Sequence, residues 1–191
     1  MTLHSAALLA GGQSTRMGRD KATLLVEGQP LWRRQLAVLA ATGASAVFIS
    51  GKKDGPWAGE HTAIPDAAPD CGPLGGLTAA LRHCTSAWLL VLAVDMPKMT
   101  PTFLRQLLAE AEREQCGIVP TLRGFIEPLA AVYPRNALPF FEAALQSRQL
   151  KLEPLIRTLA AAGLVRLRPV PEQEAELFTN WNTPSDITEP L

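Results

Sequence analysis

The stretch from residue 8 to residue 21, LLAGGQSTRMGRDK, joins an apolar run to paired glycines and a cluster of polar side chains. Gly11 and Gly12 let a ligand approach the backbone closely, and exposed amides in such a turn bind anions. Positive charge comes from Arg16, Arg19 and Lys21. The combination suits a polyphosphate, although its spacing matches neither the P-loop nor the GxGxxG fingerprint. The alternative is a tight strand-to-helix connection with solvated cations.

A second candidate, Asp95, follows the clearest apolar run of the chain in WLLVLAVDMP. A carboxylate at the carboxyl end of a buried strand lies at the edge where α/β sheets bind their ligands. It suits Mg²⁺, which takes carboxylate oxygens together with substrate phosphates. The alternative is an Asx turn or a cap for the next helix, but Thr100, followed by Pro101, already fits that cap. We therefore expect Asp95 to bind a metal ion.

The elements that position these residues follow from the apolar pattern. Strands are expected at 5–10, 46–50, 61–65, 88–94, 117–121, 129–133 and 164–168, and helices at 31–41, 74–84, 101–115, 136–149 and 152–162. The alternation predicts one α/β domain over residues 1–191, a three-layer α/β/α, Rossmann-like arrangement with a mostly parallel sheet. The stretch 51–59, GKKDGPWAG, reads as a surface loop.

Composition limits the function classes. The 191 residues carry 18 basic and 18 acidic side chains, which argues against a nucleic-acid protein or a polybasic membrane binder. The three cysteines form no CxxC pair, so a disulfide framework or zinc site is not expected and a reducing compartment fits. The apolar runs are shorter than the roughly 20 residues that span a bilayer, and the amino terminus resembles no signal peptide. We expect a cytoplasmic protein.

Residues 9–21 fit the pattern LAGGxSxRMGxDK, which resembles the signature of nucleotidyltransferases that act on the molybdenum cofactor. The chain is most similar to the guanylyltransferase family, within the wider nucleotide-diphospho-sugar transferase fold, and later segments match in order over nearly its whole length. The resemblance implies that Leu9, Ala10 and Gly11 line the guanine and ribose. It implies that the triphosphate is held by Gly12, Arg16 and Lys21, and that Asp95 binds Mg²⁺.

Further positions follow from the same resemblance. Asp66 corresponds to an aspartate that contacts the nucleotide, with Asp70 as a nearby alternative, and Ser50 occupies a nucleotide-lining position where the family often has asparagine. Gly75 lies in GPLGG, residues 72–76, where guanylyl members carry GPLxG. Together with LAGG, this segment favours GTP over CTP. From the residues alone, a compact glycine turn explains GPLGG equally well.

Two segments resemble acceptor-side motifs of the family. EPLAAVY, residues 127–133, resembles PLxAxY, with Tyr133 read as a core aromatic residue. TNWNTPSDI, residues 179–187, resembles N-x-NTPxD, and one interpretation is that the amides of Asn180 and Asn182 hydrogen-bond a pterin or a phosphate. The alternative for this segment is an Asx turn that caps a short helix at the carboxyl terminus.

The resemblance implies transfer of GMP from GTP to the phosphate of Mo-molybdopterin, with release of pyrophosphate. Arg16, Lys21 and Asp95 would be catalytic, Mg²⁺ the cofactor, and other cofactor-assembly proteins transient partners. The nearest alternatives are a CTP-dependent molybdopterin cytidylyltransferase and a guanylyltransferase that acts on another small phosphorylated acceptor. A binding protein without turnover belongs to a different class, and the intact set of charged residues argues against it.

Overall fold

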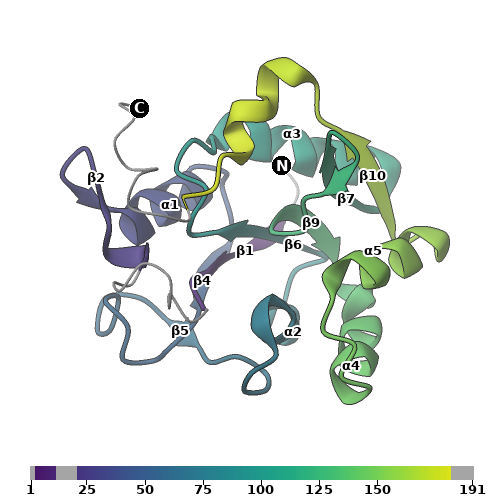
Figure 1. Cartoon of the computed structure of the whole chain (residues 1–191), viewed down its shortest axis with the longest axis horizontal. Helices are drawn as coiled ribbons and strands as arrows, with labels where there is room; N and C mark the ends of the chain where they lie inside the picture. Colours follow the sequence, from purple (N-terminus) through teal and green to yellow (C-terminus); the bar gives the residue numbers. More distant parts are fainter. Residues whose placement is uncertain (1–2, 12–20, 182–191) are drawn as a thin grey trace.

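A computed structural model describes residues 3–11 and 21–181, and its main feature is one twisted sheet (Figure 1). The strands follow the order β10-β7-β9-β6-β1-β4-β5, with β8 paired to β7 beside this path. Their bounds are β1 (His4–Leu9), β4 (Ala46–Ser50), β5 (Ala63–Ile64), β6 (Trp88–Ala93), β7 (Gly117–Leu122), β8 (Phe125–Ile126), β9 (Ala130–Pro134) and β10 (Val165–Pro169). Gly12, Arg16 and Asn182 lie outside the described residues.

Four parallel strands end at the same level of the sheet. Leu9 of β1 pairs with Ser50 of β4 and with Ala93 of β6, and Ser50 pairs in turn with Ile64 of β5. The residues that follow these strands therefore meet at one edge, as expected for ligand-binding loops of α/β sheets.

The direction of β9 was not visible in the sequence pattern. It runs antiparallel to both β6 and β7. The physical reason is the short β8 connection, because a parallel strand would need a crossover of a dozen residues or more. The mostly parallel sheet is confirmed, with β9 as an antiparallel strand within it.

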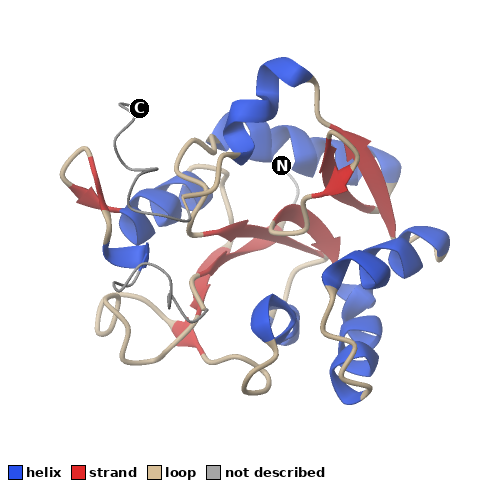
Figure 2. Cartoon of the chain, viewed as in Figure 1, coloured by secondary structure: helices blue, strands red, loops and turns tan. Residues whose placement is uncertain are grey.

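Helices cover both faces of the sheet, which confirms the three-layer arrangement (Figure 2). One face carries α1 (Leu31–Ala40) and α3 (Pro101–Glu114), and the other carries α2 (Gly72–His83), α4 (Leu138–Gln146) and α5 (Leu152–Ala161). Neighbouring residues of β1 alternate between the two faces: Ala6 and Leu8 pack under α1 and α3, whereas Ala7 and Leu9 pack on the other face. Burial on both faces explains why the central strands are continuously apolar.

The remaining differences from the expected elements are local. Helix α2 starts at Gly72 because Pro73 is tolerated in its first turn, and the short η2 turn (Arg135–Ala137) precedes α4. The apolar pattern did not predict the hairpin of β2 (Leu25–Val26) and β3 (Gln29–Pro30), the short strand β8, or the 3-10 segments η1 (Lys21–Thr23) and η3 (Glu172–Phe178). No helix in the described ranges is long and apolar enough to cross a membrane.

Candidate active site

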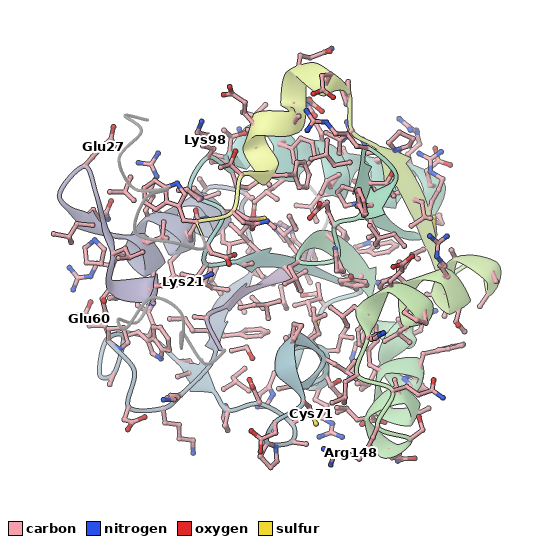
Figure 3. All side chains as sticks on the ribbon, in the orientation of Figure 1. Lys21, Glu27, Glu60, Cys71, Lys98 and Arg148 are labelled. Atoms are coloured by element: carbon pink, nitrogen blue, oxygen red, sulfur yellow. The ribbon has the colours of Figure 1, made fainter. Side chains whose placement is uncertain are left out.

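A cavity of about 160 Å³ opens at the edge where the parallel strands end. It brings together most of the residues that the sequence singled out, namely Leu9, Ala10, Gly11, Lys21, Ser50, Asp66 and Asp95. Figure 3 shows the labelled Lys21 beside this edge, on the opposite side of the molecule from α5. The lining also includes Val94, which the sequence did not single out, and Leu129 of the segment that resembles an acceptor-side motif.

Lys21 and Asp95 form an ion pair within the cavity. Asp95 lies two residues beyond the end of β6, and Lys21 begins the η1 turn. Lys21 Nζ lies 3.1 Å from Asp95 Oδ2, and the two side chains are only 20% and 24% exposed. Such partial burial limits screening by solvent, so the pair holds both groups more firmly than a surface ion pair would.

Asp66 also lines the cavity, from the loop between β5 and α2. Ser50 Oγ donates a hydrogen bond to Asp66 Oδ1 at 3.3 Å. Desolvation by neighbouring atoms raises the pKa of the Asp66 carboxyl, and the hydrogen bond from Ser50 opposes this rise. Of the two aspartates considered for the nucleotide, Asp66 lines the cavity, whereas Asp70 is absent from the lining among the described residues.

Two glycines, Gly76 and Gly11, leave space in the cavity next to Ser50 and Asp66. A Cβ atom on Gly76 would lie 2.9 Å from Ser50 Oγ, and one on Gly11 would lie 3.3 Å from Asp66 Oδ1. Any side chain at either position would therefore compete with the polar atoms for the same space. The cavity wall next to Gly76 is the first turn of α2, where Gly72 and Pro73 lie. Helix amino termini present free backbone amides that favour anions.

Gly75, which the resemblance assigned to the nucleotide site, lies next to the loop that precedes α2. Its carbonyl accepts a hydrogen bond from Ala67 N at 3.1 Å, and a Cβ there would lie 3.2 Å from the Ala68 carbonyl oxygen. Within the part of the chain that is described, Gly75 supports the loop and is not in the cavity lining, which contains Gly76 instead. The segment GPLGG indicated both glycines without distinguishing them.

The end of the described chain reaches the same site. Trp181 N donates a hydrogen bond to the Asp95 carbonyl oxygen at 2.9 Å, and the Trp181 ring is buried in the main core. Asn180 immediately precedes it and is exposed, so its role toward an acceptor stays a prediction. Tyr133 is a core residue, as expected: its hydroxyl donates to the Pro128 carbonyl at 2.8 Å, and burial raises its pKa.

Comparison with known proteins agrees with this geometry. Residues 6–163 match the family model of the MobA-like NTP transferase domain. A "Probable molybdenum cofactor guanylyltransferase" of Opitutus terrae is 36% identical over 95% of this chain and 92% of its own length. A "Molybdenum cofactor guanylyltransferase" of Xanthomonas euvesicatoria pv. vesicatoria is 33% identical over 94% of this chain and 90% of its own.

Solved structures extend the likeness to the fold. The molybdopterin-guanine dinucleotide biosynthesis protein A of Archaeoglobus fulgidus superposes with a TM-score of 0.79 at 28% identity, covering 96% of this chain and 94% of that one. The 2-C-methyl-D-erythritol 4-phosphate cytidylyltransferase of Thermus thermophilus superposes with a TM-score of 0.71 at 19% identity, covering 98% and 96%. Because the family model matches most of the chain and the relatives match it over nearly their full length, the chain belongs to the MobA-like NTP transferase family.

Proposed function

We propose that this protein transfers GMP from GTP to the terminal phosphate of Mo-molybdopterin and forms molybdopterin guanine dinucleotide and pyrophosphate. The observation that carries the proposal is the cavity at the ends of β1, β4, β5 and β6, whose lining combines the Lys21–Asp95 ion pair with Asp66. The family membership, and relatives named as molybdenum cofactor guanylyltransferases, support guanosine as the base and molybdopterin as the acceptor.

In this reaction an oxygen of the acceptor phosphate attacks the α-phosphorus of GTP, and the bond to the bridging oxygen of the β-phosphate breaks. The protein needs no side-chain nucleophile, because positioning and charge stabilisation suffice for phosphoryl-type transfer. The Lys21 ammonium would offset negative charge on the triphosphate and the leaving pyrophosphate. Arg16, outside the described residues, is proposed for the same task from the sequence motif alone.

The residues of the cavity fit a magnesium ion. Residues 3–11 and 21–181 contain no group of three or more His, Cys, Asp or Glu side chains that would form a cage. Mg²⁺ does not need one, because it is commonly held by one or two carboxylates together with substrate phosphates. Asp95, a carboxylate on the cavity wall, would hold the ion, which when bound supplies positive charge to the phosphate oxygens.

Two further residues of the cavity lining, Asp66 and Ser50, would orient the nucleoside. Asp66 offers a carboxylate acceptor to hydroxyl or N–H donors, and Ser50 fixes its orientation through the hydrogen bond to Oδ1. Leu9, Ala10 and Gly11 line the same cavity. The three cysteines are free thiols, which agrees with a cytoplasmic reaction in a reducing compartment.

The proposal is tested by incubating the purified protein with Mo-molybdopterin, Mg²⁺ and either GTP or CTP. We expect guanine dinucleotide and pyrophosphate to appear in equal amounts with GTP, as measured by chromatography and a coupled pyrophosphate assay. A product with CTP at an equal or higher rate would place the protein on the cytidylyl branch. Pyrophosphate release from GTP with a sugar phosphate but not with molybdopterin would overturn the acceptor.

A further inference from the structure

The turn that carries Asp95 is held by three hydrogen bonds between its backbone and other segments. Val94 N donates to the Leu9 carbonyl of β1 at 3.0 Å, so the start of the turn continues the sheet. Beyond it, the carbonyl of Asp95 and the carbonyl of Met96 each accept a hydrogen bond from a distant segment. These two carbonyls belong to the two successive peptide units that follow the Asp95 Cα atom, so their partners hold the backbone from which the carboxylate projects.

The partner of Met96 is a glutamine inside the core. Gln35 lies on α1, is fully buried, and donates from Nε2 to the Met96 carbonyl oxygen at 2.5 Å. Its Oε1 atom has no hydrogen-bond partner among the described residues. A buried side-chain amide whose oxygen makes no hydrogen bond lowers stability relative to an apolar side chain of the same size. Packing of α1 therefore does not explain a glutamine at this position, whereas the contact with the Asp95 turn does.

The partner of Asp95 is the backbone amide of Trp181, at 2.9 Å. The segment that delivers this amide is anchored to α3 and its preceding loop. Phe178 packs edge-on against Phe103 with ring centroids 5.4 Å apart, and Lys98, labelled in Figure 3, lies 3.8 Å from Glu176 of η3. Trp181 itself is only 4% exposed and packs in the core. Packing therefore holds the residue whose amide makes this hydrogen bond.

We propose that Gln35 and Trp181 are positioning residues that hold the Asp95 turn in the orientation the reaction needs. Neither residue lines the cavity among the described residues, so each acts on the substrate through Asp95. The inference rests on the proposed function of Asp95. Partners that orient a metal-binding carboxylate typically change metal affinity or activity by roughly ten- to a hundredfold when they are removed.

Gln35→Met separates positioning from stability. Methionine matches glutamine in length, removes the unpaired Oε1, and leaves the Met96 carbonyl its second donor, Met99 N at 3.1 Å. We expect the melting temperature to stay within a few degrees of the wild type. We also expect GTP affinity without Mg²⁺ to be unchanged in calorimetry, the gain in GTP affinity on adding Mg²⁺ to fall about tenfold, and kcat to fall more than KM changes.

Leu39→Val is the matched control, because Leu39 is fully buried on the same helix, in the same core as the Asp95 turn. It should lower the melting temperature and leave the magnesium-dependent gain in GTP affinity intact. The proposal for Gln35 is overturned if Gln35→Met keeps the full magnesium effect, or if Leu39→Val loses it to the same extent. The melting and GTP-binding readouts need no molybdopterin, so they can fail while the guanylyl transfer assay of the wild type succeeds.

Trp181 is tested by a pair of variants that keep its backbone amide. Trp181→Ala empties the ring's place in the core and releases the amide, whereas Trp181→Phe retains most of the packing. We expect Trp181→Ala to lose the magnesium-dependent gain in GTP affinity about tenfold and Trp181→Phe to restore it. Hydrogen exchange of the residue 181 amide should quicken in Trp181→Ala alone. Slow exchange and a full magnesium effect in Trp181→Ala would overturn this half of the proposal.

Discussion

Lys21 Nζ and Asp95 Oδ2 lie 3.1 Å apart although 74 positions separate the two residues in the chain. The pair connects the first glycine-rich loop to the turn after β6, and it places a cation beside the carboxylate proposed for Mg²⁺. In the proposed complex Lys21 attracts the phosphate oxygens, whereas Asp95 acts on them through the magnesium ion that it would hold. The consequences of removing either member differ.

Lys21→Ala should weaken GTP binding by roughly ten- to a hundredfold, the range for one charge-assisted hydrogen bond, and should change guanosine binding little. The reason is that the ammonium faces phosphate, not base, in the proposed complex. Titration calorimetry with GTP and with guanosine measures the difference. Lys53→Ala, a change in an exposed loop, is the control. Equal losses for both ligands would show that Lys21 does not act on the phosphates.

Asp95→Asn should abolish guanylyl transfer while the circular dichroism spectrum and the melting temperature stay close to the wild type. Asparagine keeps the shape of the side chain but removes the charge that suits Mg²⁺. The turnover assay and a thermal melt of the same preparation test this expectation. Asp54→Asn, in the exposed loop after β4, controls for loss of one negative charge. Turnover that still depends on Mg²⁺ in Asp95→Asn would contradict the metal assignment.

Gly76→Ala should lower GTP affinity by about tenfold with little change in stability. The new Cβ would lie 2.9 Å from Ser50 Oγ and 3.4 Å from Asp66 Oδ1, so Ser50 must turn away from Asp66. The better helix propensity of alanine offsets part of the cost to α2. Comparison with Ser50→Ala and the double variant gives the coupling energy between the two sites. Strictly additive losses would mean that the two residues do not share this space.

Asp66→Asn should stabilise the protein at neutral pH. Burial raises the pKa of the folded Asp66 carboxyl above its ordinary value, so the folded state binds its proton more tightly than the unfolded state. The free energy of unfolding therefore falls as pH rises from the ordinary aspartate range to the raised pKa, and the loss persists above it. Asparagine does not titrate and escapes this loss.

Denaturant unfolding of wild type and Asp66→Asn at pH 7, 5.5 and 4.5 measures the effect. The variant should be the more stable protein at pH 7, and its advantage should shrink as the pH falls. The same substitution should weaken GTP binding, because a carboxylate that accepts from the nucleoside is lost. A constant stability difference at all three pH values would show that the pKa of Asp66 is not raised in the folded protein.

The loops of the site could be predicted one by one, because the residues that indicate each loop lie close together in the sequence. Paired glycines and cations follow β1, and an aspartate follows the apolar strand β6, so each could be assigned from residues close in sequence. The same local reading was incomplete for 51–59, which was expected to be only a surface loop. Trp57 of that loop is 1% exposed, packs edge-on against Trp32, and donates from Nε1 to the Lys52 carbonyl. Its burial depends on α1, which is distant in sequence.

By itself the sequence determined the alternation of strands and helices, the mostly parallel sheet, and the edge at which Gly11, Asp66 and Asp95 must lie. Only the tertiary structure decided which side chains meet there. The pairing of Lys21 with Asp95, the antiparallel course of β9, and the contact of Gln35 with Met96 join segments whose separation no periodicity encodes. The physical reason is that hydrophobic periods report which face of an element is buried, whereas the partner on that face is selected by the packing of the whole core.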